Sequence, residues 1–335
     1  MTTQIAINGF GRIGRLLARL ILEQRPAGIA LAAINDMMDP RSCAALYKRD
    51  SVHGPASGQV EFGDDWIMVD GHRIEVTSIP DPAAMDYRSA GIDLVIEASG
   101  RFTDRKAASA HIARGARRVL ISAPAKDADI TVVQGVNHGL LRPEHAIVSN
   151  ASCTTNALAP IAAVLDRALG IERGHMTTVH SYTNDQRLHD QYHPDLRRAR
   201  GGATSMIPTS TGATKAVAEV LPQLRGKLSG ASIRVPTPNV SLIDFVFDAG
   251  RPTDEEEVKA ILADAAVGDL KGIVDATNEP MVSIDFNHNP ASVTIDLAET
   301  NVTDRRLVRV VGWYDNEWGF ANRMLDTALQ MASQL

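Results

Sequence analysis

Cys153 lies in the segment SNASCTTN (149–156), where small hydroxyl and amide side chains surround its thiol. A cysteine that only fills a core normally has apolar neighbours. The apolar run AIVSN (146–150) predicts a strand just before it, and a helix is expected over 154–169. The amides and dipole at the start of a helix stabilise a thiolate. The pattern therefore predicts a reactive, ionised Cys153.

A thiol nucleophile needs a proton acceptor, and His180 is the candidate. It stands near the end of the expected strand MTTVHSYT (176–183), before a polar run. Each residue also has a plainer interpretation, as a small buried cysteine and a packed histidine. Together, behind a nucleotide-binding half, they favour a Cys–His pair. The second cysteine, Cys43, falls in the helical pattern SCAALYKR and is interpreted as structural.

A second candidate site is the turn GFGRIG (9–14), which fits G-x-G-x-x-G. A strand at 4–7 precedes it and a helix over 12–24 opens within it. In such a turn Gly9 permits the tight bend, Gly11 lets a pyrophosphate approach the backbone, and Gly14 lets helix and strand pack closely.

The same turn predicts how an anionic ligand is held. The N–H groups of Arg12 and Ile13 would face a pyrophosphate at the positive end of the helix. Asp36 follows the next strand, at 29–35, and its carboxylate can bind adenosine ribose hydroxyls. That carboxylate would repel a 2′-phosphate, so NAD is favoured over NADP.

No metal site is predicted. His189 and His193 have i, i+4 spacing, but no third ligand accompanies them, which indicates an exposed polar turn.

Composition limits the class of protein. With 335 residues, 44% of them apolar, two domains are expected. Two cysteines give no disulfide framework, which favours a cytoplasmic protein. A net charge of −6 argues against broad binding of nucleic acid or anionic membranes. We recognise neither a signal peptide nor an apolar segment long enough to span a bilayer.

The order of elements predicts an α/β protein. In the first half, apolar runs at 4–7, 29–35, 93–99, 118–123, 131–136 and 146–150 read as strands, with helices over 12–24 and 104–115. This β-α-β rhythm is typical of a Rossmann-like, mostly parallel sheet covered by helices. We therefore expect a dinucleotide-binding domain over 1–150, completed by a C-terminal helix within 319–335.

The remainder, 151–318, predicts an α+β catalytic domain with a mixed or antiparallel sheet. Its expected strands are 176–183, 241–248, 281–286, 292–297 and 307–314. A helix should begin at Asp254, with Thr253 and Glu256 as a capping box. Pro160 inside the helix over 154–169 requires a kink or a later start. The polar segment 184–211 is expected to cover a site or contact another subunit.

The motifs taken together identify a family resemblance. They are NGFGRIGR (8–15), SNASCTTN (149–156), HSYTNDQ (180–186), DLRRAR (195–200), GKLSGASIRVPTPNVS (226–241) and WYDNEWGF (313–320). Over essentially its whole length the chain resembles phosphorylating glyceraldehyde-3-phosphate dehydrogenases of the bacterial type. The resemblance implies NAD-dependent conversion of D-glyceraldehyde 3-phosphate and inorganic phosphate to 1,3-bisphosphoglycerate, in glycolysis or gluconeogenesis. It also implies a homotetramer.

The resemblance assigns roles to individual residues. Cys153 matches the nucleophile, which forms a thiohemiacetal and then a thioester, and His180 matches the base. Asn316 matches the residue that binds the nicotinamide carboxamide, and Ser122 is a further cofactor-binding candidate. Residues implied around the substrate phosphate are Thr183, Arg198 and Arg234, and those around inorganic phosphate are Ser152, Thr154, Thr211 and Gly212.

Some positions depart from the family pattern and keep alternatives open. Ala157 replaces a common second cysteine, Gln191-Tyr192 stands where many NAD-specific members have Leu-Pro, and Pro80 replaces an arginine near the adenine. An NADP-using biosynthetic member is one alternative. Erythrose-4-phosphate dehydrogenase is another, although SYTNDQ (181–186) and TGA (211–213) favour glyceraldehyde 3-phosphate. A non-catalytic NAD-binding protein is the third.

Overall fold

The computed structural model describes residues 2–335 and divides into two compact units. The first unit holds the described residues up to Val132, then His138–Ser152 and Ala321–Leu335. The second unit holds Val133–Asn137 and Cys153–Phe320. None of the helices within residues 2–335 combines the length and apolar character that crossing a membrane requires.

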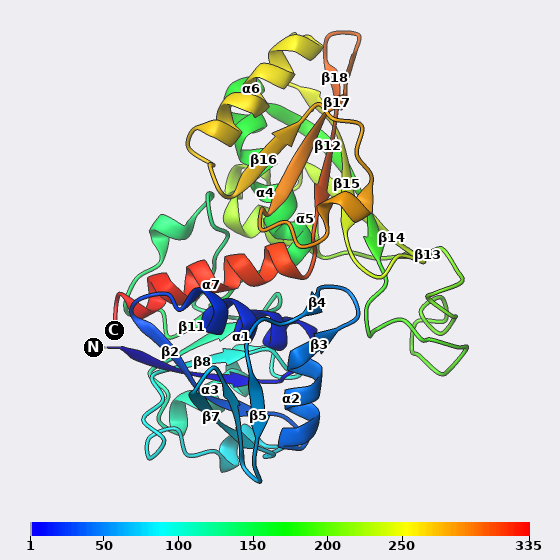
Figure 1. The fold of residues 1–335 in the computed structure, drawn as a ribbon. Helices are drawn as coiled ribbons and strands as arrows, with labels where there is room; N and C mark the ends of the chain where they lie inside the picture. The colour runs from blue at the N-terminus through cyan, green and yellow to red at the C-terminus, as the bar shows by residue number, and fades with distance from the viewer. Residues whose placement is uncertain (1) are drawn as a thin grey trace. The chain divides into compact units, whose positions relative to one another are not determined.

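The first unit is built on a nine-stranded sheet in the order β10-β11-β9-β8-β1-β2-β7-β6-β5 (Figure 1). Its strands are β1 Thr3–Asn8, β2 Ile29–Asn35, β5 Val60–Phe62, β6 Trp66–Val69, β7 His72–Thr77, β8 Leu94–Glu97, β9 Arg118–Ile121, β10 Ile130–Thr131 and β11 Ile147–Ser149. All pairs from β10 to β7 are parallel, and β6 and β5 join antiparallel at the other edge. The chain runs outward from β1 to β2 and later from β8 to β9, so the winding reverses between β1 and β8.

Helices cover both faces of this sheet, as in a Rossmann fold. They are α1 Arg12–Gln24, α2 Pro40–Lys48, α3 Arg105–Ala113 and, from Ala321 on, the greater part of α7 Trp318–Ala332. Along β1, Ala6 packs in a buried cluster with Ala108 of α3. Ile5 and Ile7, also fully buried, alternate to the opposite face, where α1 lies. Strands buried on both faces read as continuous apolar runs, which is why the sequence predicts them well.

The C-terminal end of α7 is fixed to the first unit by one buried guanidinium. Arg118, 2% exposed, donates to the carbonyl oxygens of Met331, Arg142 and His145 at 2.9–3.1 Å. Those bonds satisfy a helix-terminal carbonyl and two loop carbonyls. Smaller elements of the unit are β3 Arg49–Asp50, β4 Gly54–Pro55, η1 Pro82–Ala84 and η2 His138–Leu140.

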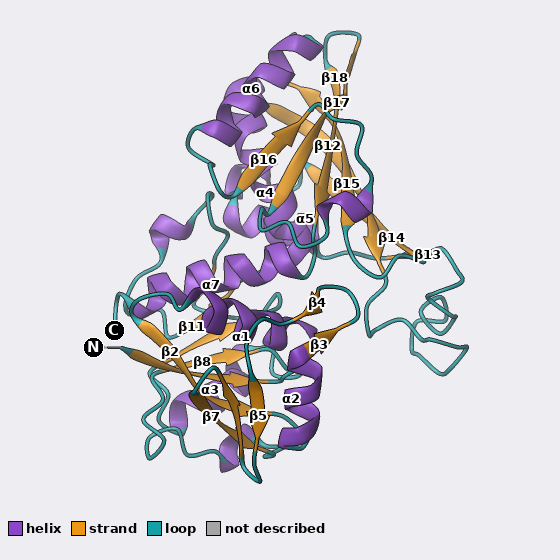
Figure 2. Cartoon of the chain, viewed as in Figure 1, coloured by secondary structure: helices purple, strands orange, loops and turns teal. Residues whose placement is uncertain are grey.

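The second unit has a seven-stranded mixed sheet in the order β13-β14-β12-β15-β18-β17-β16. Its strands are β12 Ile171–Ser181, β13 Ile207–Thr209, β14 Leu228–Val235, β15 Ser241–Ala249, β16 Val274–Thr277, β17 Val293–Thr303 and β18 Leu307–Tyr314. The pairs β12–β14 and β16–β17 are parallel and the others antiparallel. Figure 2 shows α4 Cys153–Leu169, α5 Ala213–Val220 and α6 Glu255–Val267 on one face. Short 3-10 turns are η3 Pro222–Leu224 and η4 Ser283–Phe286.

Two predicted strands are wrong or shorter than expected. The segment 281–286 forms η4, whose apolar Val282 and Ile284 are 58% and 70% exposed. The Asp285 side chain accepts from the Val282 amide at 2.8 Å and closes this turn. Of the segment 131–136, only Thr131 belongs to a strand, β10.

Two helix starts also differ from expectation. The N-cap of α6 is Asp254, whose carboxylate accepts from the Glu257 amide at 2.9 Å, so the predicted capping box is one residue out of place. Thr253 instead donates its hydroxyl to the Glu257 side chain at 2.7 Å. Helix α4 begins at Cys153 and continues through Pro160, so a later start is wrong.

Candidate active site

The glycine-rich turn joins β1 to α1 in the first unit. Gly9 has φ +98°, and a Cβ there would collide with the backbone of Ala98 and Ser99, beyond the end of β8. A Cβ on Gly14 would collide with the Gly9 carbonyl. At Gly11, by contrast, a Cβ would meet nothing within 4 Å. Two glycines therefore let backbone segments pack together, and the third leaves open space at the start of a helix for a ligand.

Asp36 stands at the end of β2 and is fixed against this turn. One carboxylate oxygen accepts from the Phe10 amide at 2.6 Å and the other from the Met38 amide at 3.1 Å. A hollow of about 210 Å³ opens beside it. Its walls are Asn8, Gly9, Gly11, Asn35, Asp36, Met37, Ile79, Pro80, Ala98, Ser99, Arg101 and Phe102.

The position of this hollow agrees with that of a dinucleotide site. The residues that line it lie at or beyond the carboxyl ends of β1, β2, β7 and β8, and the winding of the sheet reverses between β1 and β8. Open α/β sheets bind their ligands at this point. The open backbone at Gly11 and the carboxylate of Asp36 provide the groups that a pyrophosphate and an adenosine ribose require. We call this hollow the dinucleotide crevice.

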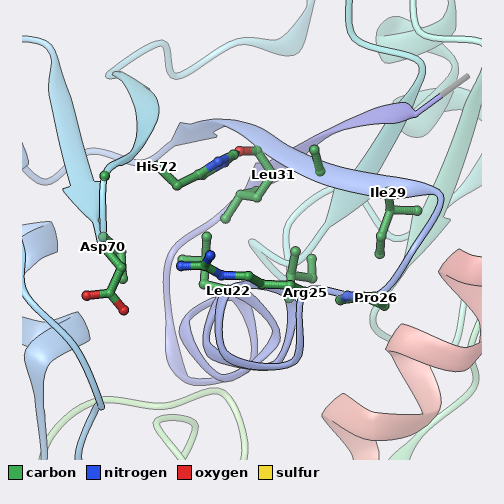
Figure 3. A pocket seen from close by; sticks show the side chains of 11 residues that line it. Leu22, Arg25, Pro26, Ile29, Leu31, Asp70 and His72 are labelled. Carbon is green, nitrogen blue, oxygen red and sulfur yellow. The ribbon is translucent and has the colours of Figure 1, made fainter.

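A larger hollow of about 370 Å³ in the same unit is lined by Leu22, Arg25, Leu31, Asp70 and His72, among others (Figure 3). It lies where α1 ends and β2 begins, at the opposite ends of the parallel strands from the dinucleotide crevice. Ligands of such sheets bind at the carboxyl ends, so this hollow is not the cofactor site.

Two predicted cofactor residues have partners of their own. The Arg12 guanidinium pairs with Asp50 at 2.5 Å, so of this residue only the backbone is expected to face a pyrophosphate. Burial opposes ionisation of Asp50, but bonds from Arg12 and two backbone amides hold the pKa of that carboxyl well below its usual range. Ser122 follows β9 and donates its backbone N–H to the Glu97 carbonyl at 2.9 Å.

The predicted Cys–His pair is brought together in the second unit. Cys153 is the first residue of α4, and His180 lies one residue before the end of β12. The thiol sulfur is 3.4 Å from His180 Nε2. Cys153 is partly exposed, while His180 is 4% exposed. The sulfur is therefore in contact with a buried imidazole, on a residue that solvent partly reaches.

The neighbours of His180 influence which ring nitrogen carries the hydrogen. Nδ1 lies 2.7 Å from the Ser181 carbonyl oxygen, which can only accept, so this contact favours a hydrogen on Nδ1, whereas the Arg234 guanidinium, which can only donate, favours a lone pair there. Arg234 Nη1 lies 2.8 Å from Nδ1 and donates to the same carbonyl at 3.1 Å. With Nδ1 protonated, the lone pair of a neutral imidazole is on Nε2 and points at the sulfur.

Burial disfavours charge on both members of this pair. Burial, assisted by the Arg234 charge, lowers the pKa of His180 to about 3. Burial also raises the pKa of the Cys153 thiol, although Arg234 and the Thr154 hydroxyl and amide oppose that effect. Desolvation thus opposes the stabilisation of a thiolate that the start of α4 predicts.

Cationic and hydroxyl groups surround the pair. His180 and Arg234 are register partners on the adjacent strands β12 and β14, which places the guanidinium beside the imidazole. Arg198 donates to Thr209 Oγ1 at 2.6 and 2.8 Å and pairs with Asp185 at 2.6 Å. Its position is therefore fixed before any anion binds.

The hydroxyl candidates are held as well. Thr183 donates to the Gln186 side chain at 3.2 Å. Thr211 Oγ1 accepts from the Ala213 amide at 3.2 Å, with Gly212 as the N-cap of α5. Ser152 immediately precedes α4. The Cys153 sulfur lies 4.0 Å from the Thr154 hydroxyl.

Comparison with known proteins identifies the family. Residues 3–105 match the family model "Glyceraldehyde 3-phosphate dehydrogenase, NAD binding domain", and residues 152–316 match its C-terminal domain. Proteins named glyceraldehyde-3-phosphate dehydrogenase from Zymomonas mobilis subsp. mobilis, Xanthobacter flavus and Cereibacter sphaeroides are 56%, 55% and 53% identical to this chain. Each alignment covers at least 99% of both chains. The chain belongs to the glyceraldehyde-3-phosphate dehydrogenase family. It is therefore an NAD-dependent oxidoreductase, and the dinucleotide crevice lies in the family's NAD-binding domain.

Asn316 fits the role that the glyceraldehyde-3-phosphate dehydrogenase resemblance implies for it. Its Oδ1 accepts from the hydroxyls of Ser181 and Ser241 at 2.9 and 2.8 Å. With the carbonyl oxygen bound in this way, the orientation of the amide is fixed and its NH₂ remains as the donor for a carboxamide ligand.

Sequence reasoning missed the residue that orients Thr154. Tyr314, 2% exposed, places its hydroxyl 2.9 Å from Thr154 Oγ1 and 2.8 Å from Thr178 Oγ1. Its ring also stands edge-on to His180, with centroids 6.0 Å apart. The three polar residues are far apart in sequence, so no local pattern marks them.

Proposed function

We propose that this member of the family catalyses the NAD-dependent oxidation of D-glyceraldehyde 3-phosphate by Cys153 and His180, with inorganic phosphate as second substrate. The product is 1,3-bisphosphoglycerate. The observation that carries this proposal is the 3.4 Å approach of the Cys153 sulfur to His180 Nε2, beside Arg234.

Proton transfer within the pair starts the reaction. As the sulfur attacks the aldehyde carbon, His180 Nε2 takes the thiol proton and returns it to the new oxyanion, giving a thiohemiacetal. His180 is then neutral again and takes the hydroxyl proton when the carbon is oxidised to a thioester. Bound NAD supplies the hydride acceptor for that oxidation. Attack of inorganic phosphate on the thioester releases the acyl phosphate and frees the thiol.

The cationic groups link anion binding to base strength. A substrate phosphate bound at Arg234 and Arg198 would offset the charge that disfavours imidazolium at His180. Anion binding should therefore raise the pKa of His180 and make proton transfer from the thiol easier. Thr154, Thr183 and Thr211 supply hydroxyl donors for the phosphate groups.

We further propose a homotetramer in the cytoplasm. Four large apolar side chains on or beside the polar segment are exposed by 75–82%: Leu188, Tyr192, Leu196 and Met206. Apolar groups this exposed and this close in sequence favour burial against another subunit. Both cysteines are free thiols, which favours a reducing compartment. Light scattering after size-exclusion chromatography tests the assembly, and a monomeric mass would contradict it.

The decisive experiment measures NADH formation with two aldehydes, two cofactors and two phosphate conditions. We expect the highest kcat/KM with D-glyceraldehyde 3-phosphate, NAD and inorganic phosphate together. Higher kcat/KM on erythrose 4-phosphate would overturn the substrate proposal, and higher kcat/KM with NADP would overturn the cofactor preference. Turnover independent of phosphate would overturn the acyl phosphate product.

A further inference from the structure

A buried carboxylate lies under the dinucleotide crevice and takes no part in the chemistry proposed above. Glu97 is the last residue of β8 and is 1% exposed. It is bonded by His111 of α3, which is fully buried, with Nε2 at 3.1 Å from Oε2. Burying a carboxylate is costly unless donors surround it, and apolar packing usually stabilises a core better than a buried ion pair. The hydrogen-bond donors around Glu97 therefore indicate a role in positioning neighbouring residues.

Glu97 bonds two residues that form the wall of the crevice. Oε2 accepts from Asn8 Nδ2 at 2.5 Å, and Oε1 accepts from the Ser99 amide at 2.8 Å and also from the Ser99 hydroxyl. Asn8 and Ser99 both line the dinucleotide crevice. The backbone of Ser99 is in addition the surface against which Gly9 packs. One carboxylate thus ties the ends of β1 and β8 together at the point where the winding of the sheet reverses.

Two further hydrogen bonds extend the same network. Asn8 Oδ1 accepts from Asn35 Nδ2 at 2.7 Å, and Asn35 Oδ1 accepts from the Ile79 amide at 2.8 Å. Asn35 and Ile79 are again residues of the crevice wall. The hydrogen bonds that start at Glu97 therefore reach both sides of the hollow and stop beside Asp36.

The other side of Glu97 is held away from solvent. Tyr87, 2% exposed, places its hydroxyl 2.9 Å from His111 Nδ1. Burial and the Glu97 charge raise the pKa of Tyr87 above its ordinary value, so the phenol keeps its proton. The phenol then donates to Nδ1, which leaves Nε2 to donate to Glu97. Along the series Tyr87, His111 and Glu97, each donor thus faces an acceptor, which fixes the orientation of the carboxylate.

We propose that Glu97, held in place by His111 and Tyr87, is a positioning residue that preforms the dinucleotide crevice before the cofactor binds. It acts through Asn8 and Ser99 and touches no reacting atom. The inference rests on the proposed use of NAD. Loss of the carboxylate should weaken binding of the dinucleotide and leave the thiol chemistry of the second unit unchanged.

The test is the substitution Glu97→Gln, which keeps the shape of the side chain but replaces one acceptor oxygen with an NH₂ group. That NH₂ group would face hydrogen-bond donors. Losing one charged acceptor of a buried network should raise the Kd for NAD by about ten- to a hundredfold. ADP-ribose, which lacks nicotinamide, should lose affinity by the same factor, since the walls in question face the adenosine and pyrophosphate side. kcat at saturating NAD and the rate of Cys153 alkylation should stay within about twofold of wild type.

Glu75→Gln is the matched control, because Glu75 is an exposed carboxylate on β7 of the same sheet. It should change none of these quantities. Tyr87→Phe removes one hydroxyl on the side of His111 away from Glu97, and it should raise the Kd in the same direction by a smaller factor. If Glu97→Gln does not fold, Tyr87→Phe decides by its Kd.

The outcomes separate the inference from the function on which it rests. A wild-type chain that binds no NAD would overturn the proposed function. Wild-type NAD affinity in a folded Glu97→Gln chain would overturn the inference alone. A lowered melting temperature with an unchanged Kd would also overturn it, since it would make the network structural only.

Discussion

Replacing the imidazole beside the thiol is the sharpest test of the proposed chemistry. His180→Asn keeps a polar side chain next to the Ser181 carbonyl but removes the nitrogen that lies 3.4 Å from the Cys153 sulfur. Burial raises the pKa of this thiol, so its reactivity near neutral pH depends on a base within reach. We expect the variant to react much more slowly with iodoacetamide, a neutral reagent that Arg234 does not attract.

The size of the effect follows from the geometry. A thiolate and an imidazolium 3.4 Å apart attract each other by about 5 kcal/mol at an effective dielectric constant of about 20. At about 1.4 kcal/mol per power of ten, this sets a ceiling of about four thousandfold. Arg234 and the Thr154 groups still stabilise sulfur anion in the variant. We therefore expect alkylation at pH 7 to slow by about a hundred- to a thousandfold, within the range found for positioned bases.

The assay follows modification of Cys153 by mass spectrometry between pH 5 and 9. Cys43 is an internal reference, because burial raises the pKa of its thiol to about 12 and it should stay unmodified. His175→Asn is the matched control, since His175 is an exposed residue of the same strand. Wild-type rates should show no histidine titration near pH 6.5, because His180 stays neutral down to about pH 3. Equal rates in the wild type and His180→Asn would refute the assigned role.

Four further predictions concern the two sites. Cys153→Ser should lose activity by about a thousandfold or more while its Kd for NAD, measured by calorimetry, stays at the wild-type value. Gly11→Ala should keep the wild-type melting temperature yet bind NAD weakly, whereas Gly9→Ala, at φ +98° and against the Ser99 backbone, should lose more than about 2 kcal/mol of stability in urea unfolding. Asp36→Asn should shift the ratio of kcat/KM for NAD over NADP toward NADP by about tenfold, because the charge that repels a 2′-phosphate is gone; an unchanged ratio would count against the assignment. Because burial lowers the pKa of His180 to about 3, the unfolded chain binds a proton between about pH 6.5 and pH 3 that the folded chain does not bind. The free energy of unfolding should therefore decrease by about 1.4 kcal/mol for each unit that the pH falls in this window, and this contribution should be absent in His180→Asn.

Regular buried elements could be predicted from the sequence. The expected helix over 12–24 and the strands at 29–35 and 307–314 agree residue for residue with α1, β2 and β18. Each has a strong apolar period, and tertiary packing only reinforces what the local pattern demands. The dinucleotide turn was predictable for the same reason, because its glycines are required by local close approaches.

Other elements have patterns that mislead. MVSIDF (281–286) alternates like a half-buried strand, yet it forms the turn η4, in which Phe286 is buried while Val282 and Ile284 beside it are exposed. Strand β14 has the small residues of LSGASIRV and no clear apolar period, so no strand was predicted there. In both cases the outcome is determined by which neighbour strand is available to pair, and that information is not local.

The candidate active site was predictable in its residue types but not in its charge state. Cys153 and His180 stand out by composition and by their places at the ends of elements. Whether the thiol is ionised depends on how much water reaches it, and that is determined by residues such as Tyr314 and Arg234, which are distant in sequence. The same is true of Glu97, which looks like an ordinary strand-end acid until His111 and Ser99 are seen to enclose it.

The register between β12 and β14 separates chemistry from recognition in this chain. His180 and Arg234 face each other across a parallel ladder, so their spacing is a property of the sheet and not of the 53 intervening residues. The exposed apolar residues of the loop between β12 and β13 can therefore change while His180 and Arg234 keep their places. Evolution can thus change the surface that this loop would present to another subunit while the base and the guanidinium stay fixed by the sheet.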